Sequence, residues 1–292
     1  MTRIVVGNRD GALALSQARS VVAELTDEWP DINFVQRTVP AGADGDTAAL
    51  LTALERNQLS IAMVSMERLP LMLPEEVTLV SVSRRFEAKS TLLGKGRLRL
   101  ADLKEGDRIG VPGPRDALFL TAVAPGIEAV VLQEQSLDNH LRLIAEDELH
   151  GLLLPASVLH ELDRRNLIGE LLEMELFPPA CGQGSVGLLV REDDDAASEL
   201  AYTLQHRPSF DRVTAEMSFR NTLSAADGKL LEQNGVPAIG ALATVTSDGE
   251  LTLFGAAISA SGNLIQATSS GEAAEAADLG RELATDFLNQ LN

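Results

Sequence analysis

The chain has 292 residues, of which 45% are hydrophobic and 3% aromatic, and its formal net charge at pH 7 is −19. The hydrophobic content excludes intrinsic disorder, and the length is sufficient for two or three domains with sizeable cores. The negative charge and the scarcity of aromatic residues argue against a nucleic-acid partner, since basic patches bind phosphates and stacked rings bind bases.

The cysteine content and the hydropathy of the sequence exclude further classes of protein. Cys181 is the only cysteine, which excludes an intramolecular disulfide and a multi-cysteine metal site. The N-terminal residues 1–8 lack the long apolar region of a signal peptide. No segment approaches the roughly 18 uninterrupted apolar residues of a membrane span. We therefore expect a cytoplasmic protein that binds neither a membrane nor nucleic acid.

Strand-like and helix-like segments alternate through the first part of the chain. Apolar runs predict the strands, and apolar positions at helical spacing predict the helices between them. The expected strands are 3–8, 32–39, 60–65 and 77–83, and the expected helices are 12–29 and 47–58. This β-α-β-α-β order predicts a parallel sheet with helices on its faces.

A second alternating set begins after residue 86. The expected strands are 108–113, 128–133 and the start of 149–159, and the expected helices are 116–124, 137–148 and the end of 149–159. Residues 176–192 then predict a return crossing. The acidic residues 193–195 begin a helix over 193–205, where negative charge suits the helix N-terminus, so a solvated helix start is favoured over a cation site.

The last part of the chain changes character. It predicts helices over 212–223 and 272–291, and strands over 240–246, 250–259 and 263–270. The strands follow one another without intervening helices, which predicts an α+β module with antiparallel strands. We expect three domains in an α/β fold: lobe 1 (1–85 with 176–198), lobe 2 (86–175) around a shared cleft, and a C-terminal domain (199–292).

Charged residues stand at the ends of several expected strands. The stretch IAMVSMERLP (61–70) ends its apolar run on Glu67 and Arg68, which are either an acid–base pair or a surface salt bridge. Arg9 and Arg115 each follow a strand within a glycine-bearing turn. Open α/β sheets bind ligands at this edge, and a solvent-exposed arginine is the alternative interpretation.

Three other motifs have simpler interpretations. Residues 182–187 match G-x-G-x-x-G, but an apolar run follows them instead of a helix, so we expect a tight turn into a strand. The four histidines are not spaced as ligands on one helix face, so no metal site is predicted. Cys181 lies beside this glycine-rich turn, and a small buried residue is favoured over a nucleophile because no sequence feature nominates a partner base.

Four stretches taken together resemble the motifs of the porphobilinogen deaminase (hydroxymethylbilane synthase) family. They are NRDGALALSQA (8–18), IAMVSMERLP (61–70), FPPACGQGSVGLLVRED (177–193) and LEQNGVPAIGALA (231–243). Their order and spacing match over nearly the whole chain. The resemblance implies two lobes like those of periplasmic binding proteins and a small C-terminal α+β domain. It also implies an enzyme that joins four porphobilinogen units on a dipyrromethane cofactor, which hangs from a cysteine of the third domain.

The chain departs from the family pattern at the positions of the family's catalytic, cofactor-attachment and substrate-binding residues. Arg68 and Glu67 occupy the positions of the family's catalytic Asp and its neighbouring Lys, and Gly235 occupies the cofactor cysteine position. A guanidinium beside the developing cationic azafulvene would oppose it by roughly 4 kcal/mol at 4 Å and an effective dielectric constant near 20. Asp116 replaces a second substrate-binding arginine, no arginine lies in 133–140, and AGADGDT (41–47) replaces the active-site loop.

These departures lead us to expect a family member that has lost its synthase activity, with no catalytic residue, no covalently attached dipyrromethane and no metal. It would bind a small anion or a tetrapyrrole intermediate. The expected ligand-binding residues are Arg9, Gly11, Gln17, Ser65, Arg68 and Arg115. The alternatives are an enzyme of altered chemistry that uses Glu67 and Arg68 or a noncovalently held cofactor, and an interaction module whose acidic surface binds a partner protein.

Overall fold

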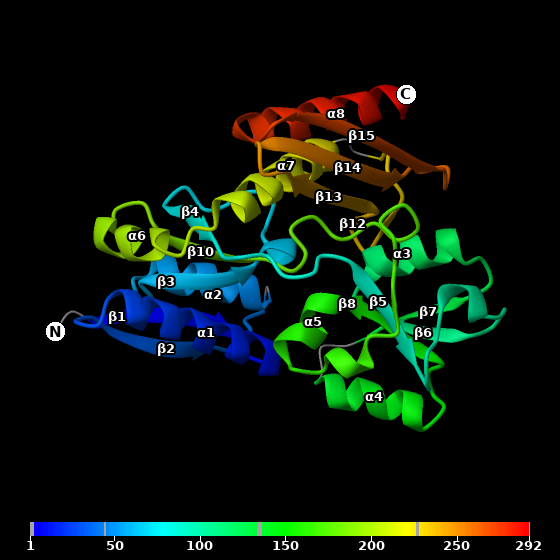
Figure 1. Cartoon of the computed structure of the whole chain (residues 1–292), viewed down its shortest axis with the longest axis horizontal. Helices are drawn as coiled ribbons and strands as arrows, with labels where there is room; N and C mark the ends of the chain where they lie inside the picture. The colour runs from blue at the N-terminus through cyan, green and yellow to red at the C-terminus, as the bar shows by residue number, and fades with distance from the viewer. Residues whose placement is uncertain (1–2, 44, 133–135, 226–227, 292) are drawn as a thin grey trace. The chain divides into compact units, whose positions relative to one another are not determined.

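The computed structural model describes residues 3–43, 45–132, 136–225 and 228–291 (Figure 1). The chain divides into two compact units, residues 1–86 with 184–210 and residues 87–183 with 211–292. None of the helices in the described ranges is long and apolar enough to cross a membrane.

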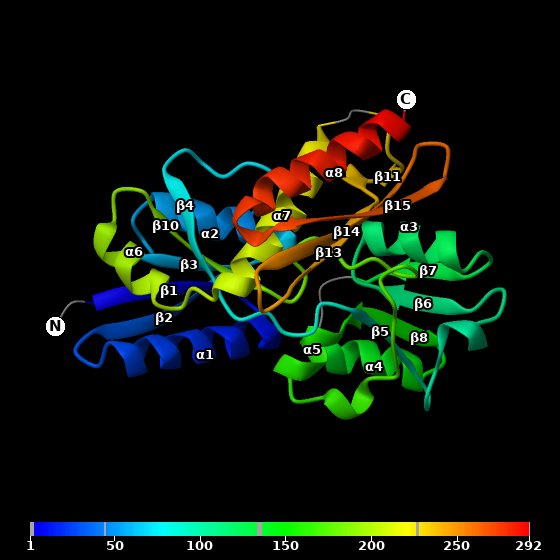
Figure 2. The same ribbon diagram turned by 45° about the horizontal axis from the view of Figure 1, so that its top comes forward.

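The first unit contains one five-stranded sheet in the order β2-β1-β3-β10-β4. Its strands are β1 (Arg3–Arg9), β2 (Asn33–Val39), β3 (Ile61–Ser65), β4 (Val77–Val82) and β10 (Val186–Arg191). β1 runs parallel to β2 and β3, and β10 lies antiparallel between β3 and β4 (Figure 2). The predicted return crossing is therefore present, with its strand confined to the end of the segment.

Helices and the interior strand supply the core of this unit. The helices are α1 (Ala12–Glu28), α2 (Asp46–Glu55) and α6 (Asp195–Tyr202), with a short 3₁₀ helix at Met66–Arg68. In α1, the buried residues Ala14, Ala18, Val21 and Leu25 recur three or four positions apart and form one apolar face. β3 is an unbroken apolar run because the sheet is covered on both faces, and its first four residues are buried.

The second unit contains a five-stranded sheet of the same topology, in the order β7-β6-β8-β5-β9. Its strands are β5 (Ser90–Gly94), β6 (Arg108–Val111), β7 (Glu128–Val131), β8 (Gly151–Pro155) and β9 (Glu170–Leu171). β6 runs parallel to β7 and β8, and β5 is antiparallel to β8 and β9. The helices α3 (Pro114–Val123), α4 (Leu137–Ala145) and α5 (Ala156–Glu161) follow β6, β7 and β8, with 3₁₀ turns at Leu100–Asp102 and Arg165–Leu167.

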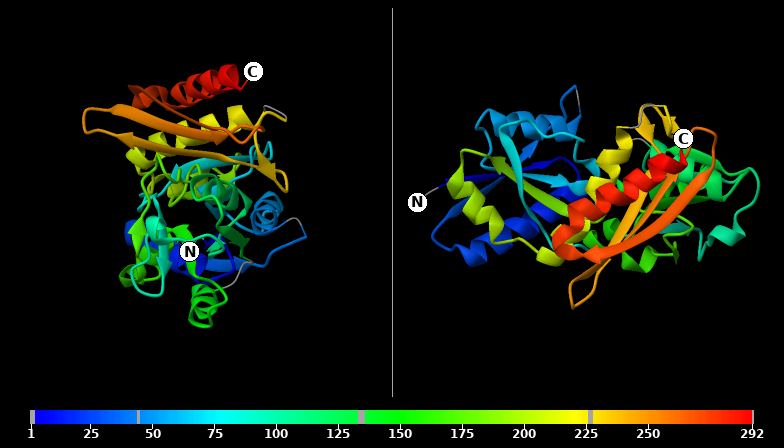
Figure 3. Two further views of the ribbon diagram at one scale, coloured as in Figure 1. Left: turned by 90° about the vertical axis from the view of Figure 1, so that its right-hand side faces the viewer. Right: turned by 90° about the horizontal axis from the view of Figure 1, so that it is seen from above.

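The C-terminal part of the second unit is an antiparallel sheet, β13-β14-β15, with two long helices. The strands are β13 (Ile239–Val245), β14 (Glu250–Ile258) and β15 (Leu264–Glu272), preceded by the small hairpin β11 (Glu232–Gln233) and β12 (Val236–Pro237). The helices are α7 (Arg207–Ser224), whose first residues belong to the first unit, and α8 (Ala276–Gln290), which follows a 3₁₀ turn at Ala273–Glu275. Figure 3 shows α8 lying across the strands of this sheet.

Both faces of β14 are covered. On one face, a side chain at Gly255 would collide with Phe219 of α7 and Leu283 of α8, so glycine permits the helices to approach closely. On the other face, Phe254 and Ile258 join the same hydrophobic core as residues of β5, β6 and α3. This double burial explains the nearly continuous apolar sequence of β14.

The α/β fold with two lobe-type sheets and a C-terminal antiparallel α+β module is confirmed. The sequence patterns did not predict β5 and β9, because β9 has only two residues and β5 (STLLG) has only two apolar side chains, too few for a recognisable apolar run. The expected strand over 128–133 ends in residues outside the described ranges. The three-domain boundaries stay a prediction, since lobe 2 and the C-terminal module pack within one unit.

Candidate functional site

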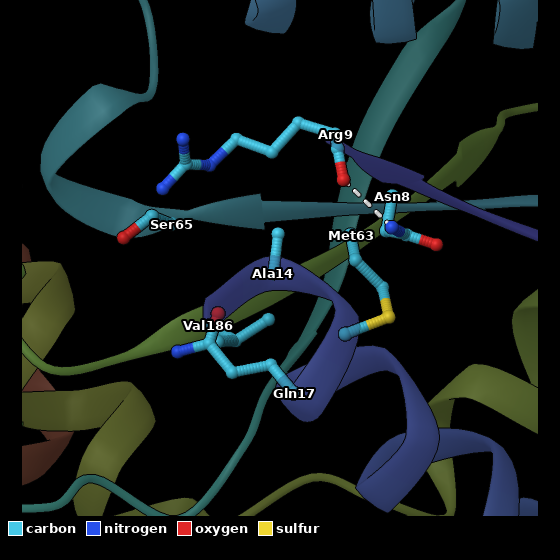
Figure 4. A pocket seen from close by; sticks show the side chains of 7 residues that line it. All are labelled: Asn8, Arg9, Ala14, Gln17, Met63, Ser65 and Val186. Atoms are coloured by element: carbon cyan, nitrogen blue, oxygen red, sulfur yellow. Dashed lines mark hydrogen bonds between the residues drawn. The ribbon is translucent and has the colours of Figure 1, made fainter. Parts of the chain in front are cut away.

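A small pocket in the first unit lies at the carboxyl ends of β1 and β3, beside the first turns of α1 (Figure 4). Its lining residues come from β1, α1, β3 and β10, and they are Asn8, Arg9, Ala14, Gln17, Met63, Ser65 and Val186. Sheets with parallel strands bind their ligands at this edge, where the strands deliver side chains into the same space.

Three predicted ligand-binding residues meet in this pocket: Arg9, Gln17 and Ser65. Figure 4 shows the Arg9 side chain extending from the end of β1 toward Ser65 at the end of β3. Asn8 is 1% exposed, and its amide donates to the Arg9 carbonyl oxygen at 2.7 Å while accepting from Gln36 Nε2 at 3.1 Å. Asn8 therefore fixes the backbone from which Arg9 projects, a role that sequence reasoning missed.

Asp46, the first residue of α2, lies between two arginines. Its Oδ2 is 3.5 Å from Nη1 of Arg9 and 3.9 Å from Nη1 of Arg68. The Asp46 and Arg9 side chains are 17% and 18% exposed, whereas that of Arg68 is 39% exposed. Asp46 therefore links Arg9, which lines the pocket, to Arg68. Asp46 was not predicted, because nothing in its local sequence indicates that it approaches residues 9 and 68.

Glu67 and Arg68 lie on the short 3₁₀ helix that directly follows β3. The backbone N–H of Met66 donates to the Ser185 carbonyl at 3.0 Å, and the Met66 side chain is buried, so this turn is anchored to the start of β10. Arg68 is not among the residues that line the pocket, and it is connected to the lining residue Arg9 through their shared partner Asp46. Ligand binding by Arg68 stays a prediction. A chemical role for Glu67 stays a prediction.

Gly11 caps the N-terminus of α1 with a φ of +109°, a conformation that side-chain-bearing residues rarely adopt. Its N–H donates to Asp10 Oδ1 at 2.7 Å. The requirement for glycine here comes from the backbone turn that places Ala14 and Gln17 at the pocket. Ligand binding by Gly11 itself stays a prediction.

Arg115 belongs to the second unit and is 8% exposed. Its Nε donates to the Ile239 carbonyl at 2.6 Å, and its Nη2 donates to the Pro178 carbonyl. Its guanidinium also stacks over the ring of Phe119, 4.6 Å from the centroid. These contacts join α3 to β13 and explain the conformation of Arg115 without a ligand, so a binding role for it stays a prediction.

Asp116 completes this buried cluster, with Oδ1 at 2.7 Å from Nη1 of Arg115. Burial raises the pKa of Asp116, because removing the carboxylate from water disfavours its charged form, and the neighbouring Arg115 charge opposes that rise. In the family resemblance, position 116 corresponds to a second substrate-binding arginine. In this chain the residue at position 116 is an aspartate, which is the counterion of Arg115.

Gly235 lies in the two-residue turn of the β11–β12 hairpin. Asn234 and Gly235 have φ values of +54° and +74°, and Asn-Gly is the preferred dipeptide of such hairpin turns. A Cβ built at Gly235 meets no atom of the described chain within 4 Å. The position thus has room for a side chain, but it carries no sulfur.

Cys181 is 3% exposed and precedes the turn Gly182–Gln183–Gly184. The Gly182 N–H donates to Glu216 Oε2 at 2.7 Å, and Gln183 Nε2 donates to the Ala88 carbonyl at 2.5 Å and to Ser90 Oγ at 3.2 Å. The turn therefore ties α7 and the start of β5 together, in agreement with its interpretation as a tight turn. Burial lowers the pKa of Arg220, and the nearby Cys181 opposes that shift.

No group of three or more His, Cys, Asp or Glu side chains within the described ranges could hold a metal ion.

Comparison with known sequences gives consistent matches to one family. The model of the family described as "Porphobilinogen deaminase, dipyromethane cofactor binding domain" matches residues 4–199. Porphobilinogen deaminase of Thermus thermophilus is 36% identical over 300 residues, covering 99% of this chain and 97% of that protein. The enzymes so named from Deinococcus deserti and Deinococcus radiodurans are 34% and 33% identical, each over 99% of this chain and 96% of their own length.

Solved structures similar to the chain include periplasmic and transporter binding proteins. A substrate-binding domain of a putative molybdenum ABC transporter from Clostridium difficile has a TM-score of 0.46 at 10% identity, covering 72% of this chain and 96% of that one. The arginine-specific periplasmic binding protein of Salmonella typhimurium has a TM-score of 0.42 at 16% identity, with coverages of 75% and 99%.

Proposed function

The chain belongs to the porphobilinogen deaminase family, and we propose that it is an enzyme of the hydroxymethylbilane synthase type, which condenses porphobilinogen with release of ammonia. The pocket at the ends of β1 and β3 carries this proposal. There Arg9, Gln17 and Ser65 come together beside the ion pairs of Asp46 with Arg9 and Arg68.

The expectation that the chain is not an enzyme is wrong. Relatives at 33 to 36% identity over 99% of the chain are named as an enzyme. The expectation rested on the residues at positions 67, 68, 116 and 235, on the lack of arginine in 133–140 and on the replaced loop at 41–47. The charge of a site is the sum over all side chains near it, and such a sum cannot be obtained from single aligned positions.

The expectation of no dipyrromethane cofactor is also wrong, because the matching family model is the dipyrromethane cofactor binding domain, so this cofactor is expected. The residue at the family's attachment position does not fit a thioether, since Gly235 has no side chain. The only thiol in the chain is that of Cys181, which is buried. Other residues of the chain would therefore have to hold the cofactor.

The charges of the first unit suit an acidic pyrrole. Porphobilinogen carries an acetate, a propionate and an aminomethyl group, so its two carboxylates can pair with guanidiniums such as those of Arg9 and Arg68. Guanidiniums bind carboxylates through paired, charge-assisted hydrogen bonds. Arg9 would hold one carboxylate arm at the pocket, and Gln17 and Ser65 would supply neutral hydrogen bonds to the same arm.

The chemical step on the substrate is loss of ammonia. The bond between the methylene carbon and nitrogen breaks, the electron pair leaves with the nitrogen, and the positive charge remains on the pyrrole as an azafulvenium. The free α-carbon of an acceptor pyrrole then bonds to the methylene and loses its proton to water. Protein groups accelerate such a step when they bind the developing cation more strongly than they bind the substrate.

The test is incubation of the purified protein with porphobilinogen, with released ammonia and oxidised uroporphyrin as the two readouts. We expect turnover within about tenfold of an authentic deaminase assayed in parallel, a difference of about 1.4 kcal/mol in barrier height. Absence of both products from a folded protein would contradict the proposal. Intact-mass measurement of the same sample distinguishes a covalently modified chain from a bare one.

A further inference from the structure

The position of Arg68 presents a problem for an enzyme that generates a cation. The resemblance places a carboxylate at this position, beside the pyrrole nitrogens, and the chain has a guanidinium there instead. Two unit charges 4 Å apart at an effective dielectric constant of about 20 change a rate by about a thousandfold. A member of this family that carries out the reaction needs a negative charge from another residue.

Asp46 provides such a charge at the same edge of the sheet. We propose that the Asp46 carboxylate stabilises the azafulvenium that forms on loss of ammonia, in place of the carboxylate absent from position 68. This inference rests on the proposed function. Asp46 Oδ2 is 3.9 Å from Nη1 of Arg68, so a carboxylate lies within one ion pair of the residue at the position where the resemblance places one.

The fold explains why three residues distant in sequence meet here. β1 and β3 are adjacent parallel strands, so Arg9 at the end of one and Arg68 just beyond the end of the other lie at the same edge. α2 begins at this edge and runs back toward the start of β3, which puts its first residue, Asp46, between the two arginines. The segment 41–47 that supplies Asp46 is the one that replaces the family's basic active-site loop.

The surroundings of Asp46 suit this role. Its side chain is 17% exposed, so it is shielded from water on most sides, and it pairs with Arg9, which lines the pocket. The arginines on either side hold the carboxylate in a defined orientation, which reduces the reorganisation needed when the cation forms. When the substrate's carboxylates bind Arg9 and Arg68, the negative charge of Asp46 becomes available to the pyrrole nitrogens.

The alternative is that Asp46 only holds the two arginines in place, and a set of variants separates these roles. Asp46→Asn keeps the shape and removes the charge, Asp46→Glu keeps the charge, and Asp46→Asn with Arg68→Asp restores a carboxylate at the position implied by the resemblance. Asp31→Asn, in an exposed turn of the same unit, is the matched control. Far-UV circular dichroism and thermal melting establish that each variant is folded.

We expect Asp46→Asn to lower kcat for porphobilinogen about a hundred- to a thousandfold, with KM within threefold of the starting protein as an order-of-magnitude expectation. Asp46→Glu should retain more activity than Asp46→Asn, and the double variant should recover at least about tenfold of the lost kcat. Asp31→Asn should match the starting protein.

A rise in KM alone for Asp46→Asn, or a double variant no faster than Asp46→Asn, would overturn the assignment and leave Asp46 as a positioning residue. Normal kcat in Asp46→Asn would overturn it as well. If the unsubstituted protein releases no ammonia while remaining folded, the proposed function itself fails, and this inference fails with it. The assay of the unsubstituted protein therefore separates the two kinds of failure.

Discussion

The two five-stranded sheets have the same topology, with β1 and β6 at corresponding places in the strand order. Each of these strands leads to an arginine: Arg9 is the last residue of β1, and Arg115 lies in the first turn of α3, which follows β6. Arg9 lines a pocket and shares a carboxylate with Arg68. Arg115 is buried, donates to two carbonyls and stacks on Phe119. Corresponding strands therefore lead to arginines with different roles, and the residues packed around each arginine decide which.

The largest expected effect that tests the difference between Arg9 and Arg115 is on the free energy of unfolding. Arg115→Met should reduce the free energy of unfolding by about 3–5 kcal/mol, because it leaves a buried Asp116 without its counterion. Urea unfolding followed by tryptophan fluorescence or circular dichroism measures the change. The fraction that remains folded should keep the KM of the unsubstituted protein. A stable variant with a raised KM would instead assign Arg115 to ligand binding.

Arg9→Gln should show the opposite pattern. The side chain is partly exposed, so its loss should change the free energy of unfolding by less than about 1 kcal/mol. The lost charge-assisted hydrogen bond to a substrate carboxylate should raise KM for porphobilinogen about 10- to 100-fold. Steady-state kinetics measures this, and an unchanged KM would show that the pocket does not hold the substrate.

The smallest effect concerns pH. The pKa of Asp116 is raised in the folded protein by burial, so the folded state binds its proton more tightly than the unfolded chain does. The stability contribution of Asp116 is therefore greatest below its ordinary pKa of 3.8 and declines as pH rises through the raised value. Asp116→Asn removes this dependence.

The stability of Asp116→Asn relative to the unsubstituted protein should accordingly increase as pH rises above about 4. Urea unfolding at a series of pH values from acidic to neutral measures the difference. A difference that is constant over this range, or that decreases as pH rises, would contradict the direction of the pKa shift.

Much of the fold followed from local patterns. The apolar run of β3 and the spaced apolar residues of α1 identified their elements, because burial on one or both faces imposes a period on the sequence. The glycine-rich turn at 182–184 was also recognised as a turn. β9 was missed because two residues carry no periodic signal, and β5 was missed because STLLG contains only two apolar side chains, whereas IAMVS of β3 contains four.

The candidate site was predicted only in part. Arg9, Gln17 and Ser65 were identified from family motifs and do meet in one pocket. Interpreting Arg68, Gly235 and the other departures position by position led to the mistaken expectation of a protein without activity, and Asp46 was missed because it carries no local motif. Asn8 was also missed, because a buried amide that orients a neighbour has the same sequence signature as any polar residue at a strand end.

The sequence by itself determined the α/β class, the family, and the lack of a thiol at position 235, because these depend on residue identity and on periods along the chain. Only the tertiary structure decided which arginine is buried and which carboxylate faces Arg68. Residues 9, 46 and 68 meet because two parallel strands and a helix end at one edge of a sheet. Coulomb interactions depend on distance in space, so the charge of this site became visible only after the chain had folded.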